Sequence, residues 1–184
     1  MAVPDDWPGI WAVLSPVVAA GRTYTYPRDM TADQGRSAWI LPSPWVVLVA
    51  VDEPGRIVAT ARYGPNLPGS GAHVANASFV VDPQRARRGI GRALAERVLA
   101  DARAAGYRAM QFNAVVETNA GAVALWRTRG FDGQATVPEG FDHPERGLVG
   151  LHIMHRTLEP RPHSRVAGAA GLQVPARSRP PAGP

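Results

Sequence analysis

The 184-residue sequence contains no cysteine and no lysine, and it has no long apolar run. The lack of cysteine excludes disulfides and thiolate metal sites, and we expect no bound metal. Without a run long enough to span a bilayer, and without the layout of a signal peptide at its start, the chain is expected in the cytoplasm with no membrane partner. Hydrophobic residues still make up 45% of the chain, which is enough for one domain with a real core.

The basic residues are all arginine, and the formal net charge of +5 raises the question of nucleic-acid binding. Residues 159–184 carry four of the arginines and a single glutamate, so more than half of the excess lies there. Much of the rest lies between Arg85 and Arg92, and no basic stripe is interleaved with aromatic residues. We therefore expect no specific nucleic-acid partner and keep such binding as a minor alternative that removal of residues 159–184 would abolish.

Hydrophobic periodicity and turn residues predict one α/β domain over residues 1–158. Residues 159–184 are rich in Pro, Arg, Ala and Gly without periodicity, which predicts a disordered tail. A first helix should begin after Asp5 or Asp6 and end at Gly21, with a kink or a split at Pro16. The further expected elements are helices over about 31–40, 91–105 and 120–129, strands over about 45–51, 56–63, 73–81, 107–116 and 148–158, and a loop over 136–147.

The most informative stretch joins the strand that ends at Val81 to the helix that begins near Gly91. Asp82-Pro83 ends the strand, and the turn that follows contains Gly89 and several arginines. Glycine lets an anion approach the backbone amides, the helix start contributes its dipole, and arginine suits phosphate oxygens. The turn is therefore either a phosphate-binding site or, with equal weight on these residues alone, an ordinary turn with solvated arginines.

Two motifs together resemble those of the GNAT acyltransferases. Ala86-Arg87-Arg88-Gly89-Ile90-Gly91 is similar to the family's acetyl-CoA signature, Gln/Arg-x-x-Gly-x-Gly/Ala, and departs from it at Ala86. The segment from Asn119 to Phe131 is similar to Asn-x-x-Ala-x-x-Leu-Tyr-x-x-x-Gly-Phe, although by itself Asn119 could be only a helix cap. The resemblance covers roughly residues 5–158.

The resemblance implies the GNAT acyl-CoA N-acyltransferase fold, a mixed and mostly antiparallel twisted sheet flanked by helices. The family's first strand should be short or missing, because only Met1 to Pro4 precede the first helix. It also implies acetyl-CoA as the cosubstrate, with the thioester carbonyl polarised by a main-chain N–H of residues 79–81. The residues implied to bind it are Phe79, Val80, Val81, Arg87, Arg88, Gly89, Ile90, Gly91, Arg92, Asn119, Ala122 and Trp126.

The catalytic residues are less clearly marked. Trp126 stands where many family members have a tyrosine that protonates the leaving thiolate, and an indole N–H cannot act as such an acid. The strand over 73–81 has no carboxylate to serve as a base. By strand parity Asn76 and Ser78 share a face and could hold a water that relays the amine proton. Glu117 is a second candidate base, although a solvated loop residue is the simpler interpretation.

Acceptor contacts are expected from Tyr24, Tyr26, Asn113 and His152, although the tyrosines could equally pack on the sheet and a strand histidine is more often structural. Resemblance to a GNAT group that acetylates toxic amino-acid analogues favours a small amine, including a zwitterionic amine, an amino acid or an amino-acid analogue. We predict direct acetyl transfer in a ternary complex, because no cysteine can carry an acyl intermediate. A protein N-terminal or peptide acetyltransferase, a non-catalytic acetyl-CoA sensor and a homodimer remain open.

Overall fold

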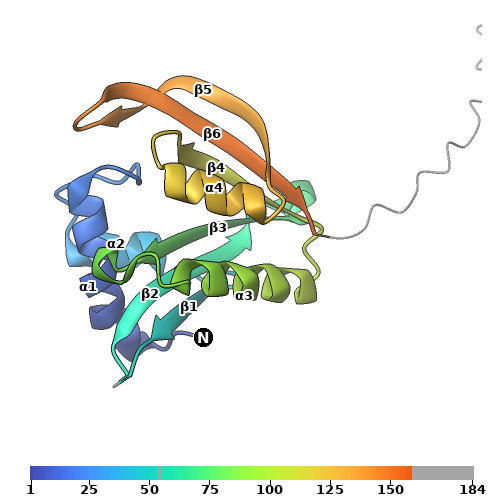
Figure 1. Ribbon diagram of the computed structural model, residues 1–184. Coiled ribbons are helices and arrows are strands. Elements are labelled where there is room, and N and C mark those ends of the chain that lie inside the picture. The colour runs from blue at the N-terminus through green and yellow to red at the C-terminus, as the bar shows by residue number, and fades with distance from the viewer. Residues whose placement is uncertain (54, 159–184) are drawn as a thin grey trace, which may run out of the picture.

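A six-stranded sheet forms the centre of the structure, a computed structural model that describes residues 1–53 and 55–158. The strand order is β1-β2-β3-β4-β6-β5 (Figure 1). The strands are β1 (Val46–Val51), β2 (Ile57–Pro65), β3 (Val74–Val81), β4 (Ala109–Val116), β5 (Asp132–His143) and β6 (Gly147–Thr157). The helices are α1 (Trp7–Ala20), α2 (Ala32–Trp39), α3 (Ile90–Ala104) and α4 (Ala120–Thr128), with short 3-10 turns at Pro4–Asp6, Gly69–Gly71 and Pro83–Arg85.

Helices cover both faces of this sheet, and each face has its own core. On one face α1 and α2 bury a cluster that includes Ile10, Leu14 and Trp39. On the other face α3 and α4 pack over a larger cluster that includes Val98 and Trp126. These layers are the ones expected of an α/β domain, and the mixed, mostly antiparallel sheet confirms the predicted fold class.

The strands β3 and β4 are the parallel pair in an otherwise antiparallel sheet. They are paired only at Val74 with Ala109 and at Ala75 with Met110, so beyond these residues the two strands splay apart. The crossover between them is α3, which packs against β2 and β3 (Figure 1). The splay leaves one edge of β3 without a neighbouring strand from Asn76 to Val81, and this edge leads to the turn before α3.

The chain before α1 contributes no strand among the described residues, as expected. Ala2 donates one backbone hydrogen bond to the carbonyl of Val47 on the edge strand β1. Of the kink or split predicted at Pro16, the split is wrong, since α1 runs as a single helix from Trp7 to Ala20, and the kink stays a prediction. One interior proline removes one helical hydrogen bond, and the burial of Ile10, Leu14 and Val18 outweighs that loss.

The predicted loop over 136–147 is also wrong, because most of it belongs to β5. This edge strand is exposed at every position from Asp132 to Gly140, so it shows no alternating hydrophobic pattern. Its pairing with β6 shifts register between Val137 and Phe141, where Glu139 has a positive φ of 52°. The backbone ladder therefore defines the strand, and side-chain patterning does not.

No helix within the described residues combines the length and the apolar character needed to cross a bilayer. The predicted disordered tail, residues 159–184, lies outside the described residues.

Candidate functional site

The turn between β3 and α3, residues 82–91, has the backbone of an anion-binding site; we call it the phosphate turn. Asp82 accepts a hydrogen bond from the N–H of Gln84 at 2.9 Å and so starts the 3-10 turn. Arg87 and Gly89 then adopt left-handed φ angles of 63° and 81°. Left-handed residues in such a turn, followed by the unpaired first N–H groups of a helix, are typical of backbones that direct several donors toward one anion.

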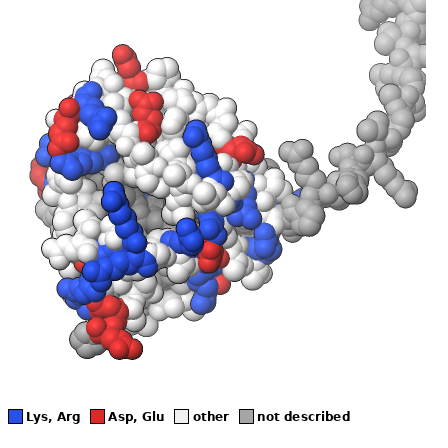
Figure 2. All heavy atoms as spheres, viewed as in Figure 1, with Lys and Arg blue, Asp and Glu red and all other residues white. Residues whose placement is uncertain are grey.

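Space around Gly89 is open, because a Cβ added there would meet no protein atom within 4 Å. Arg87, Arg88 and Arg92 are exposed, and within the described part of the chain none of them has a carboxylate partner. Arg85 differs, since it pairs with Asp52 at 3.0 Å. Arginine side chains gather beside a hollow on this face of the molecule (Figure 2), and such side chains suit the oxygens of an anion.

The open edge of β3 presents particular peptide groups toward the splay. Asn66 donates to the carbonyl of Val74, and Asp82 donates to that of Val58. In an antiparallel ladder alternate residues direct both backbone polar groups to the same neighbour, so the N–H and C=O groups of the even-numbered residues of β3 point toward β2. The N–H groups of Phe79 and Val81 therefore point toward the splay, whereas that of Val80, also expected to contact the cofactor, points toward β2.

The side chain of Tyr24 fills the place of a neighbouring strand at Phe79. Its hydroxyl donates to the carbonyl of Phe79 at 3.0 Å and accepts from the N–H of Phe79 at 3.1 Å. Ser78 lies beside this hydroxyl. Burial raises the pKa of Tyr24, with a further contribution from Tyr26, so the hydroxyl stays protonated at physiological pH.

Four amide side chains form a network where β3 and β4 begin to splay. Asn66 accepts from Asn76 at 3.1 Å and from Asn113 at 2.7 Å, and Gln111 donates to Asn113 at 2.8 Å. The network brings the predicted residues Asn76 and Asn113 together across the two strands. Asn66, which joins them, was not predicted as a site residue, because it lies in a loop with no pattern of its own.

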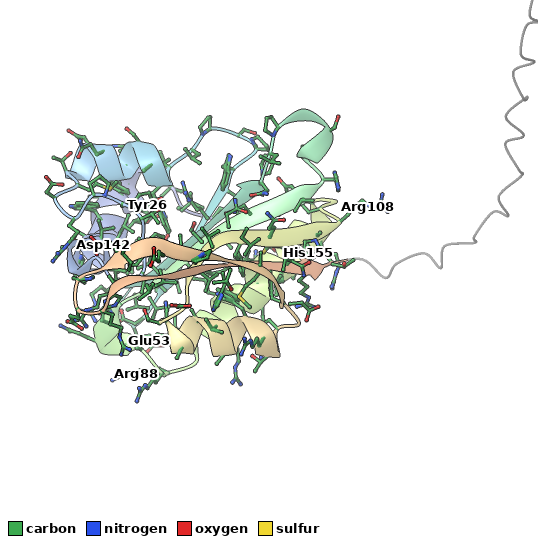
Figure 3. The ribbon with its side chains drawn as sticks, turned by 90° about the horizontal axis from the view of Figure 1, so that it is seen from above. Tyr26, Glu53, Arg88, Arg108, Asp142 and His155 are labelled. Carbon is green, nitrogen blue, oxygen red and sulfur yellow. The ribbon has the colours of Figure 1, made fainter. Side chains whose placement is uncertain are left out.

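A cavity of about 280 Å³ lies between the segment after α1 and the strand β5. Tyr24 and Tyr26 line it, with ring centroids 5.4 Å apart and nearly parallel planes. Figure 3 shows Tyr26 and Asp142 close together on one side of the molecule and Arg88 on the other. The residues that line this aromatic pocket are Gly21, Tyr24, Thr25, Tyr26, Arg28, Gly140, Phe141 and Asp142.

Arg62 supports the aromatic pocket from β2. Its guanidinium lies over the rings of Trp39 and Trp45, at 5.2 and 5.3 Å from their centroids, and donates to the hydroxyl of Tyr26 at 3.1 Å. We did not predict this residue. An arginine inside the otherwise apolar segment Ile57–Tyr63 was the available indication, because such a charge needs a partner on its face of the sheet.

The second motif has the expected local structure. The side-chain oxygen of Asn119 accepts from the N–H of Ala122 at 3.2 Å, so Asn119 caps α4. Trp126 is buried, with its ring 4.8 Å from that of Phe79 and 4.5 Å from that of Phe112. The indole therefore bridges the two splayed strands on the face covered by α3 and α4.

Neither Glu117 nor His152 is among the residues that line the aromatic pocket. The Nδ1 of His152 lies 2.8 Å from the hydroxyl of Thr136, and both line a separate cavity of about 190 Å³ that also includes Arg127 of α4. Glu117 is exposed, and its carboxylate lies over Gly150, close to Thr136. Within the described residues, no group of three or more His, Asp or Glu side chains is placed to hold a metal ion.

Comparisons with known proteins agree on one family. The model of the family described as "Acetyltransferase (GNAT) family" matches residues 13–131. A GCN5-related N-acetyltransferase from Kribbella flavida is 49% identical, with a TM-score of 0.81 over 85% of this chain and 94% of that one. A phosphinothricin acetyltransferase from Sinorhizobium meliloti, solved in complex with acetyl-CoA, is 21% identical, with a TM-score of 0.76 over 85% of both chains, which shows the same fold.

A match to a curated protein is shorter. The N-acetyltransferase aca1 of Schizosaccharomyces pombe is 32% identical over 90 residues, which span 49% of this chain and 43% of that protein.

Proposed function

Because the chain belongs to the GNAT family of acetyl-CoA-dependent N-acetyltransferases, we propose that it transfers the acetyl group of acetyl-CoA to the amine of a small molecule. The phosphate turn would bind the pyrophosphate through Gly89, Ile90 and Gly91, and the arginines would add charge. The open edge of β3 would pair with the amides of the pantetheine arm as a further strand would.

A single observation carries the proposal. The aromatic pocket and the open edge of β3 meet at one place, where the Tyr24 hydroxyl contacts the peptide of Phe79. A thioester held along that edge would end next to the pocket, so a bound amine could attack its carbonyl carbon directly. Since the whole sequence lacks cysteine, transfer through an acyl-cysteine is excluded.

The transfer requires a proton to leave the amine and another to reach the sulfur as the C–N bond forms and the C–S bond breaks. Asn76 and Ser78 lie on the same face of β3, and we assign to them the water that takes the amine proton. Trp126 is not a proton donor to the sulfur, since its indole is no acid and its ring is packed in the core. Water would therefore deliver that proton, and positioning would supply most of the rate.

The size and charge of the aromatic pocket support a small acceptor. A volume of about 280 Å³ suits an amino acid or a compact amine better than a polypeptide. The ion pair between Arg22 and Glu145 also ties the segment after α1 to the turn after β5, so the two walls of the pocket are linked. Arg28 and Asp142, which both line the pocket, offer opposite charges to a zwitterion.

A second function, a non-catalytic acetyl-CoA sensor, is favoured by two observations. The strand β3 carries no carboxylate, and Trp126 replaces the tyrosine expected as an acid. A sensor would bind acetyl-CoA without consuming it.

The deciding experiment is a CoA-release assay with acetyl-CoA against amines, free amino acids, their carboxamides and short peptides, run with the full chain. Turnover of free amines or amino acids above that of peptides is the expected result. Turnover of peptides alone would contradict a small acceptor and would indicate a protein substrate. Binding of acetyl-CoA with no turnover on any acceptor would favour the sensor.

A further inference from the structure

Tyr24 connects the aromatic pocket with the open edge of β3. Its ring forms part of the pocket wall and stacks on Tyr26. Its hydroxyl makes hydrogen bonds to both polar groups of Phe79, at 3.0 Å to the carbonyl and 3.1 Å to the N–H. One side chain therefore contacts the place where an acceptor would lie and a backbone donor on the edge where a thioester would lie.

The peptide of Phe79 needs this partner because no strand supplies one. Phe79 belongs to the odd-numbered residues of β3, whose polar groups point away from β2, and β4 pairs with β3 only as far as Ala75. A buried peptide group without a partner costs as much as a lost hydrogen bond, so the phenol of Tyr24 stabilises the splay. Any ligand that used the N–H of Phe79 would have to replace that phenol.

On this edge the N–H of Phe79 has a hydrogen bond to Tyr24, a residue that lines the pocket. Val81 lies next to the phosphate turn, so the part of an extended ligand nearest its phosphates would pass there. Phe79 lies two residues, one strand repeat, farther from that turn. The end of the ligand, which carries the acetyl group, would therefore arrive at Phe79. Free CoA lacks the acetyl carbonyl and has no acceptor for that N–H.

We propose that the thioester carbonyl of acetyl-CoA displaces the Tyr24 hydroxyl from the N–H of Phe79, so that Tyr24 senses the acetyl group and transmits its presence to the aromatic pocket. The proposal rests on the proposed function, because it requires acetyl-CoA to bind along β3. Tyr24 is then a positioning residue: its displacement rearranges a wall of the pocket only when an acetyl group is present. Acceptor binding would follow acetyl-CoA binding and would not follow binding of CoA.

The test compares the dissociation constants of acetyl-CoA and CoA by calorimetry for the wild type, Tyr24→Phe and Tyr26→Phe. In Tyr24→Phe the acetyl carbonyl no longer competes with a hydroxyl, so the preference for acetyl-CoA over CoA should rise about three- to tenfold, the worth of one neutral hydrogen bond. Tyr26→Phe is the matched control. It also removes a phenol that accepts a hydrogen bond, from Arg62, but this phenol makes none with Phe79, so the preference should stay at the wild-type value.

A preference in Tyr24→Phe that is equal to or lower than that of the wild type would overturn the proposal, because the hydroxyl would then be irrelevant or would itself help to bind the carbonyl. Failure of the wild type to bind either ligand would instead overturn the proposed function, and this proposal with it.

A crystal structure of the wild type with acetyl-CoA tests the same point without a variant. The thioester oxygen should lie within hydrogen-bonding distance of the N of Phe79, with the hydroxyl of Tyr24 moved away from it. Retention of both hydrogen bonds between Tyr24 and Phe79 in that complex would refute the displacement.

Discussion

At the scale of single residues, Gly89 is the position where backbone geometry and proposed chemistry coincide. Its φ of 81° lies in the left-handed region, and open space surrounds the place of a side chain. The protein itself therefore does not require the lack of a Cβ for packing. A ligand that approaches the backbone closely does require the lack of a Cβ. A substitution at Gly89 can therefore test ligand binding without disturbing the packing of the protein.

Replacing Gly89 with alanine should weaken acetyl-CoA binding at least tenfold while leaving the protein folded. The methyl group would hold the pyrophosphate away from the amides, and the left-handed φ should cost about 1 kcal/mol of stability. Gly106→Ala is the matched control, because Gly106 has a φ of 88° and equally open surroundings at the other end of α3. Calorimetric titration and urea unfolding of both variants would test the pair, and equal affinities would contradict a phosphate site at Gly89.

Trp126 should matter more for stability than for proton transfer. Its ring packs against Phe79 and Phe112, so Trp126→Ala should lower the free energy of unfolding by about 3–5 kcal/mol. Trp126→Tyr should cost less and should retain activity in the CoA-release assay. If Trp126→Tyr were fully folded but inactive, the indole would have a direct role with a ligand.

At the scale of elements, the segments that build the aromatic pocket were the hardest to predict. Periodicity and turn residues predicted β3, the phosphate turn and α3, because Asp82, Pro83 and Gly106 mark their ends locally. The strand β5 was missed, since its exposed residues carry no pattern and only pairing with β6 defines it.

Contacts between distant parts of the chain were equally hidden from the sequence. The hydrogen bonds that link Tyr24 to Phe79 join residues 55 positions apart, which no local pattern reveals. The tyrosines were predicted at the acceptor pocket only through the family resemblance. The sequence thus predicted the backbone of the phosphate turn better than the side chains that line the aromatic pocket.

The packing of α1 on α2, which flank the segment that carries the tyrosines, predicts opposite results for two helical glycines. An alanine Cβ at Gly35 of α2 would lie 2.3 Å from the ring of Trp11, so Gly35→Ala should destabilise the protein by about 1–3 kcal/mol despite its better helix propensity. Gly121 of α4 is the control, since its nearest neighbour would be 4.0 Å away, and Gly121→Ala should raise stability by about 0.5 kcal/mol. Equal shifts in urea unfolding would contradict this packing.

At the scale of the whole molecule, the two faces of the sheet have separate tasks. The face with α3 and α4 carries the larger core and the helix that follows the phosphate turn, and the face with α1 and α2 borders the aromatic pocket. The splay between β3 and β4 joins them, as a ternary complex requires. In the proposed ternary complex, acetyl-CoA and the acceptor would therefore enter from opposite faces of the sheet and meet at the thioester carbonyl.

The composition gives the whole molecule a distinctive response to alkaline pH. With no lysine and no cysteine, the side chains that ionise between about pH 9 and 12 are tyrosines. Burial raises the pKa of Tyr24, Tyr63 and Tyr107 in the folded protein. Their contribution to stability is complete below the unfolded pKa of about 10 and is lost as the pH rises above it.

Urea unfolding at pH 8 and pH 11 should therefore show a loss of stability for the wild type and a smaller loss for Tyr24→Phe. Tyr24 is the most strongly shifted of the three tyrosines, so its removal takes away the largest single contribution to the loss. The same loss in both proteins would show that the Tyr24 phenol is not buried as described.

The most direct test of the central claim is calorimetric titration of the full chain with acetyl-CoA. We expect one binding site per chain with a dissociation constant in the micromolar range, and competition by free CoA, because the phosphate turn would hold the part that the two ligands share. A folded protein that shows no binding of acetyl-CoA would contradict the phosphate turn, the proposed function and the role assigned to the open edge of β3.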